Sequence, residues 1–428
     1  MAKTKKQPLF PSDFMWGAST AAHQVEGHNK NQWTEWEHKH ASRFARKAPR
    51  LNLWPTNSML KKLPIWQHIK YQATDPNNYI SGRGVEHFTR YTQDFDMLQQ
   101  LNLNTFRFSI EWSRIEPSEG EWNQEAIEHY RQYITELRSR NIEPFPTLWH
   151  WTMPVWFTKK GGFEKKRNIK YFERFVEKIS TELLDGIRYV TTLNEPNAYV
   201  MSAYIVADHP PGKRNLLLNA IVFSRLKLAH RRAYKILKKH HPRIQVGISA
   251  ALVNIQAKRP HRYIDQFMTQ TMRYIWNWWF LNRINATQDF VGINYYLTWY
   301  YQGLMIKNPK VPLSDMGWYM EPEGLYPILI RAHDRYKKPI IICENGVSDY
   351  KDTYRRWWLE ETTIAMQRAL SEGVDLRGYL HWSLLDNFEW AYGWWPKFGL
   401  VEVNRKTMQR TPRESAKWWA GWIKENGQ

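Results

Sequence analysis

The chain has 428 residues, of which 43% are hydrophobic, and it carries a formal net charge of +20. This length fits one elaborated α/β barrel, the lack of a long apolar run excludes a transmembrane helix, and the scattered basic residues argue against a nucleic-acid-binding face. The only cysteine, Cys343, excludes an internal disulfide, and with no apolar stretch behind the basic N-terminus the cytoplasm is the expected location.

Eight short apolar segments follow one another along the chain, and helical periodicity separates most of them. Strands that alternate with helices pair in parallel through right-handed crossovers, so eight units predict a single-domain (β/α)8 TIM barrel, residues 1–428. An open doubly wound sheet is the alternative, but no Gly-x-Gly-x-x-Gly turn follows the first strand. The predicted strands are 14–19, 105–110, 142–149, 188–193, 244–250, 290–294, 339–343 and 378–382.

The segment between the first two strands, residues 28–80, breaks this alternation because it lacks sustained periodicity. We expect a long loop region at the active-site face, and its aromatic content favours an ordered lid over disorder. Prolines at positions 144 and 146 make the third strand the least regular one. The predicted helices are 86–101, 124–140, 166–185, 217–241, 323–337, 354–373 and 412–425.

Two short motifs place a glutamate where a predicted strand ends: Thr-Leu-Asn-Glu-Pro at 192–196 and Cys-Glu-Asn-Gly at 343–346. In a parallel barrel this is the end where catalytic groups collect. A lone glutamate there is usually a helix cap or a solvated loop residue, but two of them, each beside an asparagine, form a more specific pattern. Two converging carboxylates are what cleavage of a glycosidic bond requires.

Four further motifs accompany these glutamates, and together they resemble glycoside hydrolase family 1, the retaining β-glycosidases. The match runs in order from about residue 8 to residue 425. Two departures stand out, since Cys343 replaces the family's usual threonine and the stretch 251–289 is short and rich in Trp and Tyr. The further motifs are Phe-Met-Trp-Gly-Ala-Ser-Thr-Ala-Ala-His-Gln-Val-Glu-Gly (14–27), Arg-Phe-Ser-Ile-Glu-Trp-Ser-Arg (107–114), Thr-Leu-Trp-His-Trp-Thr-Met-Pro (147–154) and Trp-Ser-Leu-Leu-Asp-Asn-Phe-Glu-Trp (382–390).

The resemblance implies that Glu195 is the acid/base and Glu344 the nucleophile. It also implies that Arg107 points its guanidinium at Glu344, which would lower the pKa of that carboxyl, although a structural salt bridge remains the alternative for Arg107. Asn294 and Tyr296 would add hydrogen bonds beside the nucleophile. The positions implied to contact the sugar are Gln24, His150, Trp151, Asn194, Trp382, Glu389 and Trp390.

These residues predict an exo-acting β-glycosidase that releases terminal β-D-glucosyl residues, with galactosyl and fucosyl as further candidates. A 6-phospho-β-glycosidase is the enzymatic alternative, which the carboxylate of Glu389 disfavours. A catalytically weak sugar-binding barrel is the non-enzymatic one, which two retained glutamates disfavour. The expected partners are small β-glycosides, with no nucleic acid, membrane, metal or other cofactor; the oligomeric state stays open.

Overall fold

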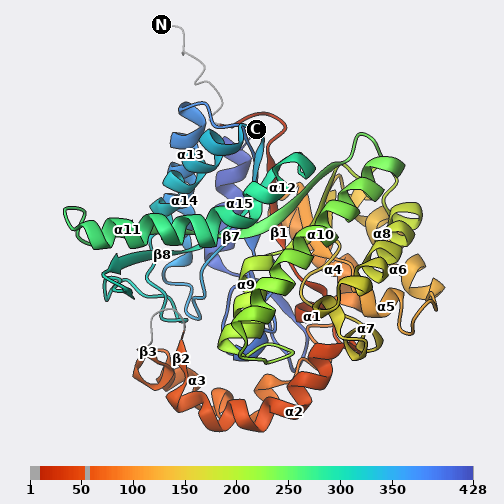
Figure 1. Cartoon of the computed structure of the whole chain (residues 1–428), viewed down its shortest axis with the longest axis horizontal. Helices are drawn as coiled ribbons and strands as arrows, with labels where there is room; N and C mark the ends of the chain where they lie inside the picture. Colours follow the sequence, from red (N-terminus) through yellow and green to blue (C-terminus); the bar gives the residue numbers. More distant parts are fainter. Residues whose placement is uncertain (1–9, 54–57, 428) are drawn as a thin grey trace, which may run out of the picture.

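The computed structural model describes residues 10–53 and 58–427, and at its centre eight parallel strands close into a ring (Figure 1). Positions 8 and 9 of the motif-bearing range and positions 54–57 of the 28–80 segment lie outside the described residues. The ring closes because β8 pairs with β10, which confirms the predicted TIM barrel. In ring order the strands are β10 (Ile340–Asn345), β11 (Leu376–Trp382), β1 (Met15–Ser19), β4 (Thr105–Ser109), β5 (Glu143–Thr147), β6 (Tyr189–Asn194), β7 (Gln245–Ala257) and β8 (Val291–Gln302).

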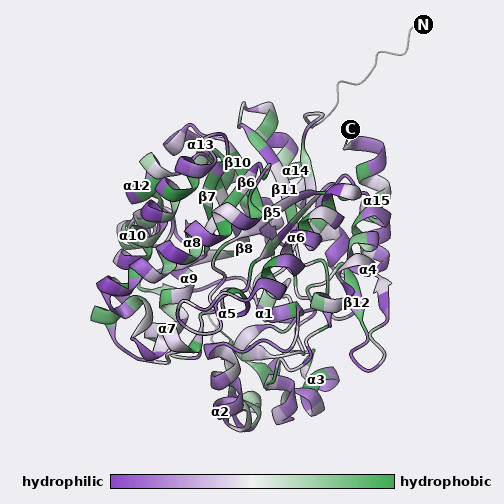
Figure 2. Cartoon of the chain, turned by 90° about the vertical axis from the view of Figure 1, so that its right-hand side faces the viewer, coloured by the Kyte–Doolittle hydropathy of each residue, from purple (hydrophilic) through white to green (hydrophobic). Residues whose placement is uncertain are grey.

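Seven long helices cover the ring from outside, and each matches a predicted helix to within about three residues at either end. Each turns an apolar stripe inward, and the hydropathy colouring shows hydrophobic strands inside a hydrophilic outer surface (Figure 2). The helices are α4 (His87–Gln100), α6 (Gln124–Ser139), α8 (Ile169–Leu183), α10 (Leu216–His240), α13 (Leu325–Tyr336), α14 (Arg355–Ser371) and α15 (Glu414–Asn426).

The irregular third strand, β5, forms as predicted despite its two prolines. It pairs with β4 over five residues, from Thr105↔Glu143 to Ser109↔Thr147, but its pairing with β6 reduces to Thr147↔Thr191. Proline has no backbone N–H to donate, so one side of this strand loses ladder hydrogen bonds. The ring therefore has fewer paired positions between β5 and β6 than between β4 and β5.

The segment predicted as a long loop, 28–80, contains a helix of four turns, so the prediction of no regular structure was wrong there. Asn31 begins α2 (Gln32–Lys47) with a capping box, accepting from the backbone N–H groups of Trp33 and Thr34. Trp33 then reaches Trp390 near the barrel mouth, with ring centroids 4.9 Å apart. The segment also contains the short elements β2 (Asn52–Leu53), β3 (Ser58–Met59) and α3 (Trp66–Ala73), and the short helix α1 (Ala22–Val25) precedes it.

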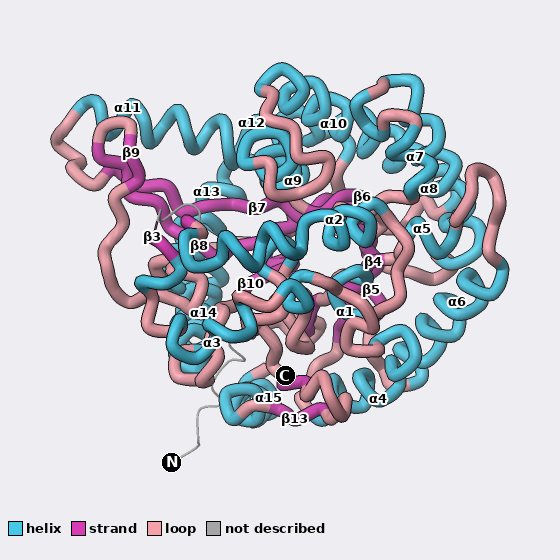
Figure 3. The backbone as a smooth tube through the Cα atoms, turned by 90° about the horizontal axis from the view of Figure 1, so that it is seen from below, coloured by secondary structure: helices cyan, strands magenta, loops and turns pink. Residues whose placement is uncertain are grey.

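Two barrel strands run well past the ring, which the predicted ends at 250 and 294 did not anticipate. β7 and β8 stay paired out to Ala257↔Tyr301, and β8 then turns back into β9 (Met305–Ile306). Between β7 and β8 in the chain lie α11 (Tyr263–Met272), a π-helix (Arg273–Trp278) and α12 (Trp279–Ile284). We call residues 251–278 and 297–306 the arm; α11 and β9 project from the body of the molecule (Figures 1 and 3).

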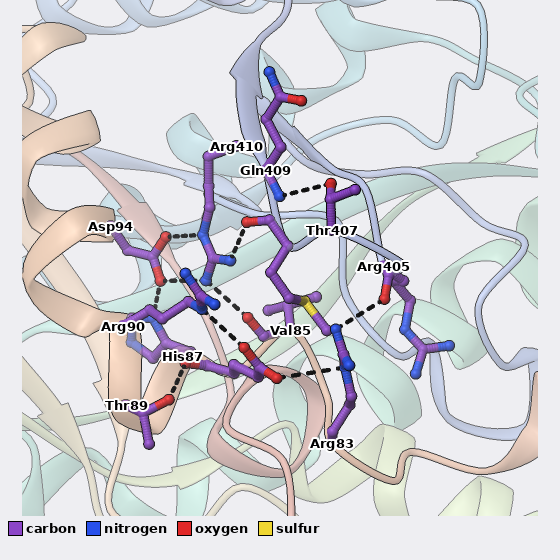
Figure 4. A network of polar contacts seen from close by, with 12 residues as sticks. Arg83, Val85, His87, Thr89, Arg90, Asp94, Arg405, Thr407, Gln409 and Arg410 are labelled. Carbon is purple, nitrogen blue, oxygen red and sulfur yellow. Dashed lines mark hydrogen bonds and ion pairs between the residues drawn. The ribbon is translucent and has the colours of Figure 1, made fainter.

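The far end of the chain is fixed to the barrel by a buried polar network (Figure 4). Arg410 of β13 (Arg410–Pro412), which pairs with β12 (Val401–Val403), donates to Asp94 of α4 at 2.8 and 3.1 Å and to the carbonyl of Val85 at 2.7 Å. His87 completes the network at 2.8 Å from Asp94. Buried charges are retained when each has such partners.

The remaining short α-helices are α5 (Trp112–Ile115), α7 (Val155–Lys159) and α9 (Pro196–Met201).

Candidate active site

The two motif glutamates lie at the carboxyl ends of barrel strands, as predicted. Glu195 follows β6 directly and precedes Pro196, the first residue of α9, while Glu344 lies in β10 opposite Asn294 of β8. Both side chains face one cavity and are nearly buried, with 8% and 4% of Glu195 and Glu344 exposed. Two carboxyl groups with little access to water therefore meet in one cavity.

Arg107 connects the two halves of this site. It lies in β4, is 0% exposed, and donates from Nη1 to Glu344 Oε1 at 2.6 Å and from Nη2 to Asn194 Oδ1 at 2.7 Å. This is the contact with Glu344 that the resemblance implied. A buried guanidinium with carboxylate and amide acceptors holds both side chains in a fixed geometry.

Asn294 provides the expected hydrogen bonding to Glu344, which opposes the rise in the pKa of that carboxyl, and it also bonds to Glu195. Its Nδ2 donates to Glu195 Oε1 at 2.9 Å and to Asn194 Oδ1 at 3.2 Å. The oxygens of Glu344 already have donors, because Arg107 bonds to Oε1 and the Tyr296 hydroxyl donates to Oε2 at 2.9 Å. Tyr296 thus supports Glu344, while Asn294 lies between the two carboxyls and also orients Glu195.

The electrostatic environments of the two carboxyls differ. Burial, reinforced by the charge of Glu344, raises the pKa of Glu195 to about 8. Burial also raises the pKa of Glu344, so the expected net lowering was wrong, although the charge of Arg107 and the hydrogen bonds from Arg107 and Tyr296 oppose that rise. Only Glu344 contacts a cation directly, which favours Glu344 as the ionised member and Glu195 as the protonated one.

A third carboxyl, Glu389, lies in the loop after β11 and lines the same cavity. Its Oε2 accepts from Asn387 Nδ2 at 2.9 Å and from Gln24 Nε2 at 3.3 Å. Burial above all, with a contribution from the charge of Glu344, raises the pKa of Glu389 to about 7. Glu389 is therefore not the fixed anion expected from the sequence, because near neutral pH its carboxyl is partly protonated.

Several buried polar atoms around the cavity have no hydrogen-bond partner among the described residues. His150 is neutral, because burial and the charge of Arg107 hold its pKa well below the usual range. Its Nε2 contacts the Asn194 Nδ2 donor at 2.9 Å, which leaves the proton on Nδ1. That Nδ1, Gln24 Oε1 and Asn294 Oδ1 are unpartnered. Such atoms need a polar ligand, and a sugar offers several hydroxyls.

Aromatic rings enclose this polar end. Trp151 donates from Nε1 to the carbonyl of Asn194 at 3.0 Å, and its ring lies 5.0 Å from that of Trp390. Trp382 ends β11 and lies 5.8 Å from the His150 ring. Trp151, Trp390 and Glu195 all have positive φ, at 71°, 47° and 42°. Such backbone costs about 1–3 kcal/mol per residue and is typical of functional sites.

The other half of the cavity is apolar and was not predicted residue by residue. It is lined by Met201, Val206, Leu252, Trp276, Leu297 and Trp318, partly from the arm. Sequence reasoning also missed Asn387 and the contact of Trp33 with Trp390, although Asn387 lies inside the motif at 382–390. No signal in the sequence singled out the apolar half, because its residues come from five separate segments.

Within the described residues no group of three or more His, Cys, Asp or Glu side chains is arranged to hold a metal ion. Cys343 is buried beside the site, and burial raises the pKa of its thiol to about 11. The described helices include none that is both long and apolar enough to cross a membrane.

The sequence and fold both match known proteins along the whole chain. The model of "Glycosyl hydrolase family 1" matches residues 55–284 and 281–428, and the chain belongs to this family. It is a β-glucosidase-type glycosyl hydrolase.

Three relatives illustrate the range of the match. Beta-glucosidase A of Acetivibrio thermocellus is 28% identical, with 98% of this chain and 99% of that protein covered. The aryl-phospho-beta-D-glucosidase BglC of Bacillus subtilis is also 28% identical, with 98% of each covered. The structure of a beta-glycosidase from Pyrococcus horikoshii is 32% identical, covers 99% of both chains and superposes with a TM-score of 0.83.

Proposed function

We propose that the protein is a retaining exo-β-glycosidase that releases terminal non-reducing β-D-glucosyl residues by double displacement. Glu344 attacks the anomeric carbon while Glu195 gives its proton to the departing glycosidic oxygen. Water then loses a proton to Glu195 and releases the sugar from Glu344. The observation that carries this proposal is the unequal pairing of the two buried carboxyls, Arg107 with Glu344 and the neutral amide of Asn294 with Glu195.

The polar end of the cavity supports a sugar as the group bound beside the carboxyls. Asn194 is held by Arg107 and Asn294, and its neighbour His150 has an N–H without a partner. At the far edge, Glu389 and Gln24 can exchange hydrogen bonds with hydroxyls. Glucose presents hydroxyls around its whole ring, which suits this spread of donors and acceptors; galactose and fucose differ from it at that edge.

Single substitutions of the two glutamates test the assignment. Glu344→Ala should abolish turnover of 4-nitrophenyl β-glucoside, and added azide should restore part of it and give the α-glucosyl azide, the inverted product. Glu195→Ala should lower kcat/KM for an unactivated disaccharide by about 10²–10⁴-fold, yet still be glycosylated by substrates with good leaving groups.

The matched control is Glu425→Gln, which changes an exposed carboxylate on α15 and should leave turnover unchanged. Near wild-type rates of either site variant on the disaccharide would contradict the roles. An inverted product from the unaltered protein would contradict retention, for which the two carboxyls should lie roughly 5–5.5 Å apart.

A 6-phospho-β-glycosidase is the second candidate, and the match to an aryl-phospho-β-D-glucosidase favours it. The partial protonation of Glu389 weakens the repulsion of a phosphate, but a carboxyl that is bonded to two neutral amides still offers a dianion no cation. We therefore expect a higher kcat/KM for 4-nitrophenyl β-glucoside than for its 6-phosphate, and Glu389→Ser should reduce that preference. Faster cleavage of the phosphorylated substrate by the unaltered protein would select the second candidate.

A further inference from the structure

Exposed apolar side chains gather on the arm, away from the catalytic carboxyls. Seven of the fourteen exposed large apolar side chains among the described residues lie on it, although it forms less than a tenth of the chain. Single exposed apolar residues are ordinary, but a cluster of them marks an interaction surface. The seven are Tyr263, Ile264, Phe267, Tyr274, Ile275, Leu304 and Met305, with Tyr263 the most exposed at 81%.

The aromatic members of this cluster form a stripe along one helix face. Tyr263, Phe267 and Tyr274 follow one another at helical spacings of four and seven, which places them on one face of α11 and the π-helix. The Tyr263 and Phe267 rings stack with centroids 6.3 Å apart. The turn that carries Leu304 is tied to the same helix, because the N–H of Gly303 donates to Asp265 Oδ1 at 2.8 Å.

At its C-terminal end the stripe meets a groove lined with arginines. Tyr274 and Gln270 line this groove together with Arg273, Arg331 and Arg335, and Asp334 at its edge pairs with Lys337 at 3.0 Å. Arg273 donates to the carbonyl of Ile255 at 2.7 Å, and Arg335 to Asn282 Oδ1 at 2.7 Å. Within the described part of the chain, the three arginines form no ion pair. Burial and the charge of Arg331 lower the pKa of Arg273 to about 10.

The three guanidinium groups of this groove outnumber its one carboxylate, that of Asp334, and they repel one another, so a bound anion would stabilise the groove. Arginine pairs with phosphate through two parallel hydrogen bonds, which makes phosphate the fitting anion class. The arm itself is basic: its one acidic residue, Asp265, is buried and bonded to Arg259 at 2.9 Å. Four exposed cations lie on the arm or directly follow it in the chain, namely Lys258, Arg262, Lys307 and Lys310.

We propose that the arm docks on an anionic phospholipid surface, with the apolar stripe in the interface and headgroup phosphates in the arginine groove. An apolar face edged with Lys and Arg is the pattern of a segment that lies on a bilayer. A second copy of this chain fits less well, because two arms of equal basic charge repel. The chain's charge of +20 adds long-range attraction to an anionic surface.

Flotation with lipid vesicles tests this docking. The full chain should float with vesicles of phosphatidylcholine mixed with phosphatidylglycerol, remain behind with phosphatidylcholine alone, and lose binding as sodium chloride is raised. The apolar variant Tyr263→Ser/Phe267→Ser/Leu304→Ser should lower the partition coefficient at least tenfold. The groove variant Arg331→Gln/Arg335→Gln should lower it roughly fivefold for each arginine removed.

The matched control is Leu216→Ser/Leu217→Ser, which changes two leucines of α10 that are 77% and 70% exposed but lie off the arm. It should float like the unaltered chain, and thermal unfolding should show that all variants are folded. Flotation that none of the arm variants weakens would overturn the proposal.

Three further results would also overturn it. Stabilisation of the unaltered chain by inorganic phosphate, without flotation, would make the groove a small-anion site. A dimer in sedimentation velocity that the apolar variant turns into monomers, again without flotation, would assign the stripe to self-association. Single-stranded RNA binding that the groove variant abolishes, with no vesicle binding, would assign the arginines to nucleic acid.

Discussion

At the scale of single residues, the site is defined by how differently Glu195 and Glu344, the glutamates of the proposed mechanism, are surrounded. Glu344 contacts a guanidinium and a phenol, whereas the carboxyl of Glu195 accepts its hydrogen bond from the neutral amide of Asn294. The proton needed for catalysis therefore remains on Glu195 at neutral pH, where burial and the charge of Glu344 both hold it. Once Glu344 is glycosylated, that charge disappears, the pKa of Glu195 falls, and Glu195 can accept a proton from water.

This arrangement predicts the alkaline limb of the pH–rate profile. Since Glu195 must be protonated and burial raises its pKa to about 8, kcat/KM should fall as pH rises through about 8. The hydrogen bond from Asn294 lowers the pKa of Glu195, so Asn294→Ala should move the limb to higher pH as well as reduce the rate. Profiles of kcat/KM for an unactivated glucoside check this. A limb that stays in place or moves down in Asn294→Ala would contradict the assigned cause.

That the two motif glutamates meet in one cavity could be predicted from short motifs, but the energetics of their side chains could not. Glu195 and Glu344 stand beside asparagines at strand ends, a local pattern visible in the sequence. The pKa of Glu344 depends on a balance between burial, which raises it, and the charge of Arg107, which lowers it. Arg107 and Glu344 are 237 positions apart in the chain, so no local pattern gives the direction of the net pKa shift. The bond of Asn294 to Glu195 was not predicted for the same reason, because it depends on how side chains from separate strands meet.

At the scale of elements, the barrel was predictable because its strands are buried on both sides and read as continuous apolar runs. The continuation of β7 and β8 beyond the ring changes to alternation, with Val253, Ile255, Trp299 and Tyr301 buried in a small core of their own. Helix α2 was missed because its buried positions include Glu37, Ala41 and Ala45, which do not form an apolar stripe. The extensions of β7 and β8 are therefore buried against a core outside the barrel, and α2 is buried through small and polar residues. Neither pattern matches the continuous apolar runs that identified the barrel strands.

The network around Arg410 predicts how firmly the C-terminal hairpin of β12 and β13 is held. Arg410→Met removes hydrogen bonds to Asp94 and Val85 and leaves Asp94 buried beside His87 without its cation. Breaking such a pair from one side should lower the free energy of unfolding by about 3–5 kcal/mol. Denaturant unfolding of the full chain measures this.

The control on the same hairpin is Lys406→Met, an exposed position that should change stability by less than about 0.5 kcal/mol. Adding Asp94→Leu to Arg410→Met should recover part of the lost free energy of unfolding, because the double variant no longer buries the Asp94 carboxylate without a cation. If Arg410→Met unfolded like the control, the network would not hold the hairpin.

At the scale of the whole molecule, the order of elements was predictable because strand–helix alternation leaves few ways to close a parallel sheet. The distribution of charge over the surface was not, since it depends on which side chains end up paired. With 61 basic and 41 acidic residues, many lysines and arginines have no acidic partner available anywhere in the chain. Excess charge of one sign destabilises the compact state through self-repulsion.

This excess predicts that salt stabilises the protein. The screening length falls from about 30 Å at 0.01 M to about 10 Å at 0.1 M salt, so repulsion across the molecule weakens, while short buried pairs such as that of Arg107 with Glu344 are little affected. Raising sodium chloride over this range at pH 7 should raise the Tm by a few degrees. The matched variant Lys61→Gln/Lys62→Gln/Lys406→Gln changes three exposed lysines, lowers the net charge from +20 to +17, and should start from a higher Tm and gain less. A Tm that falls with salt in both proteins would mean that exposed ion pairs, which salt weakens, outweigh the repulsion of the unpaired cations.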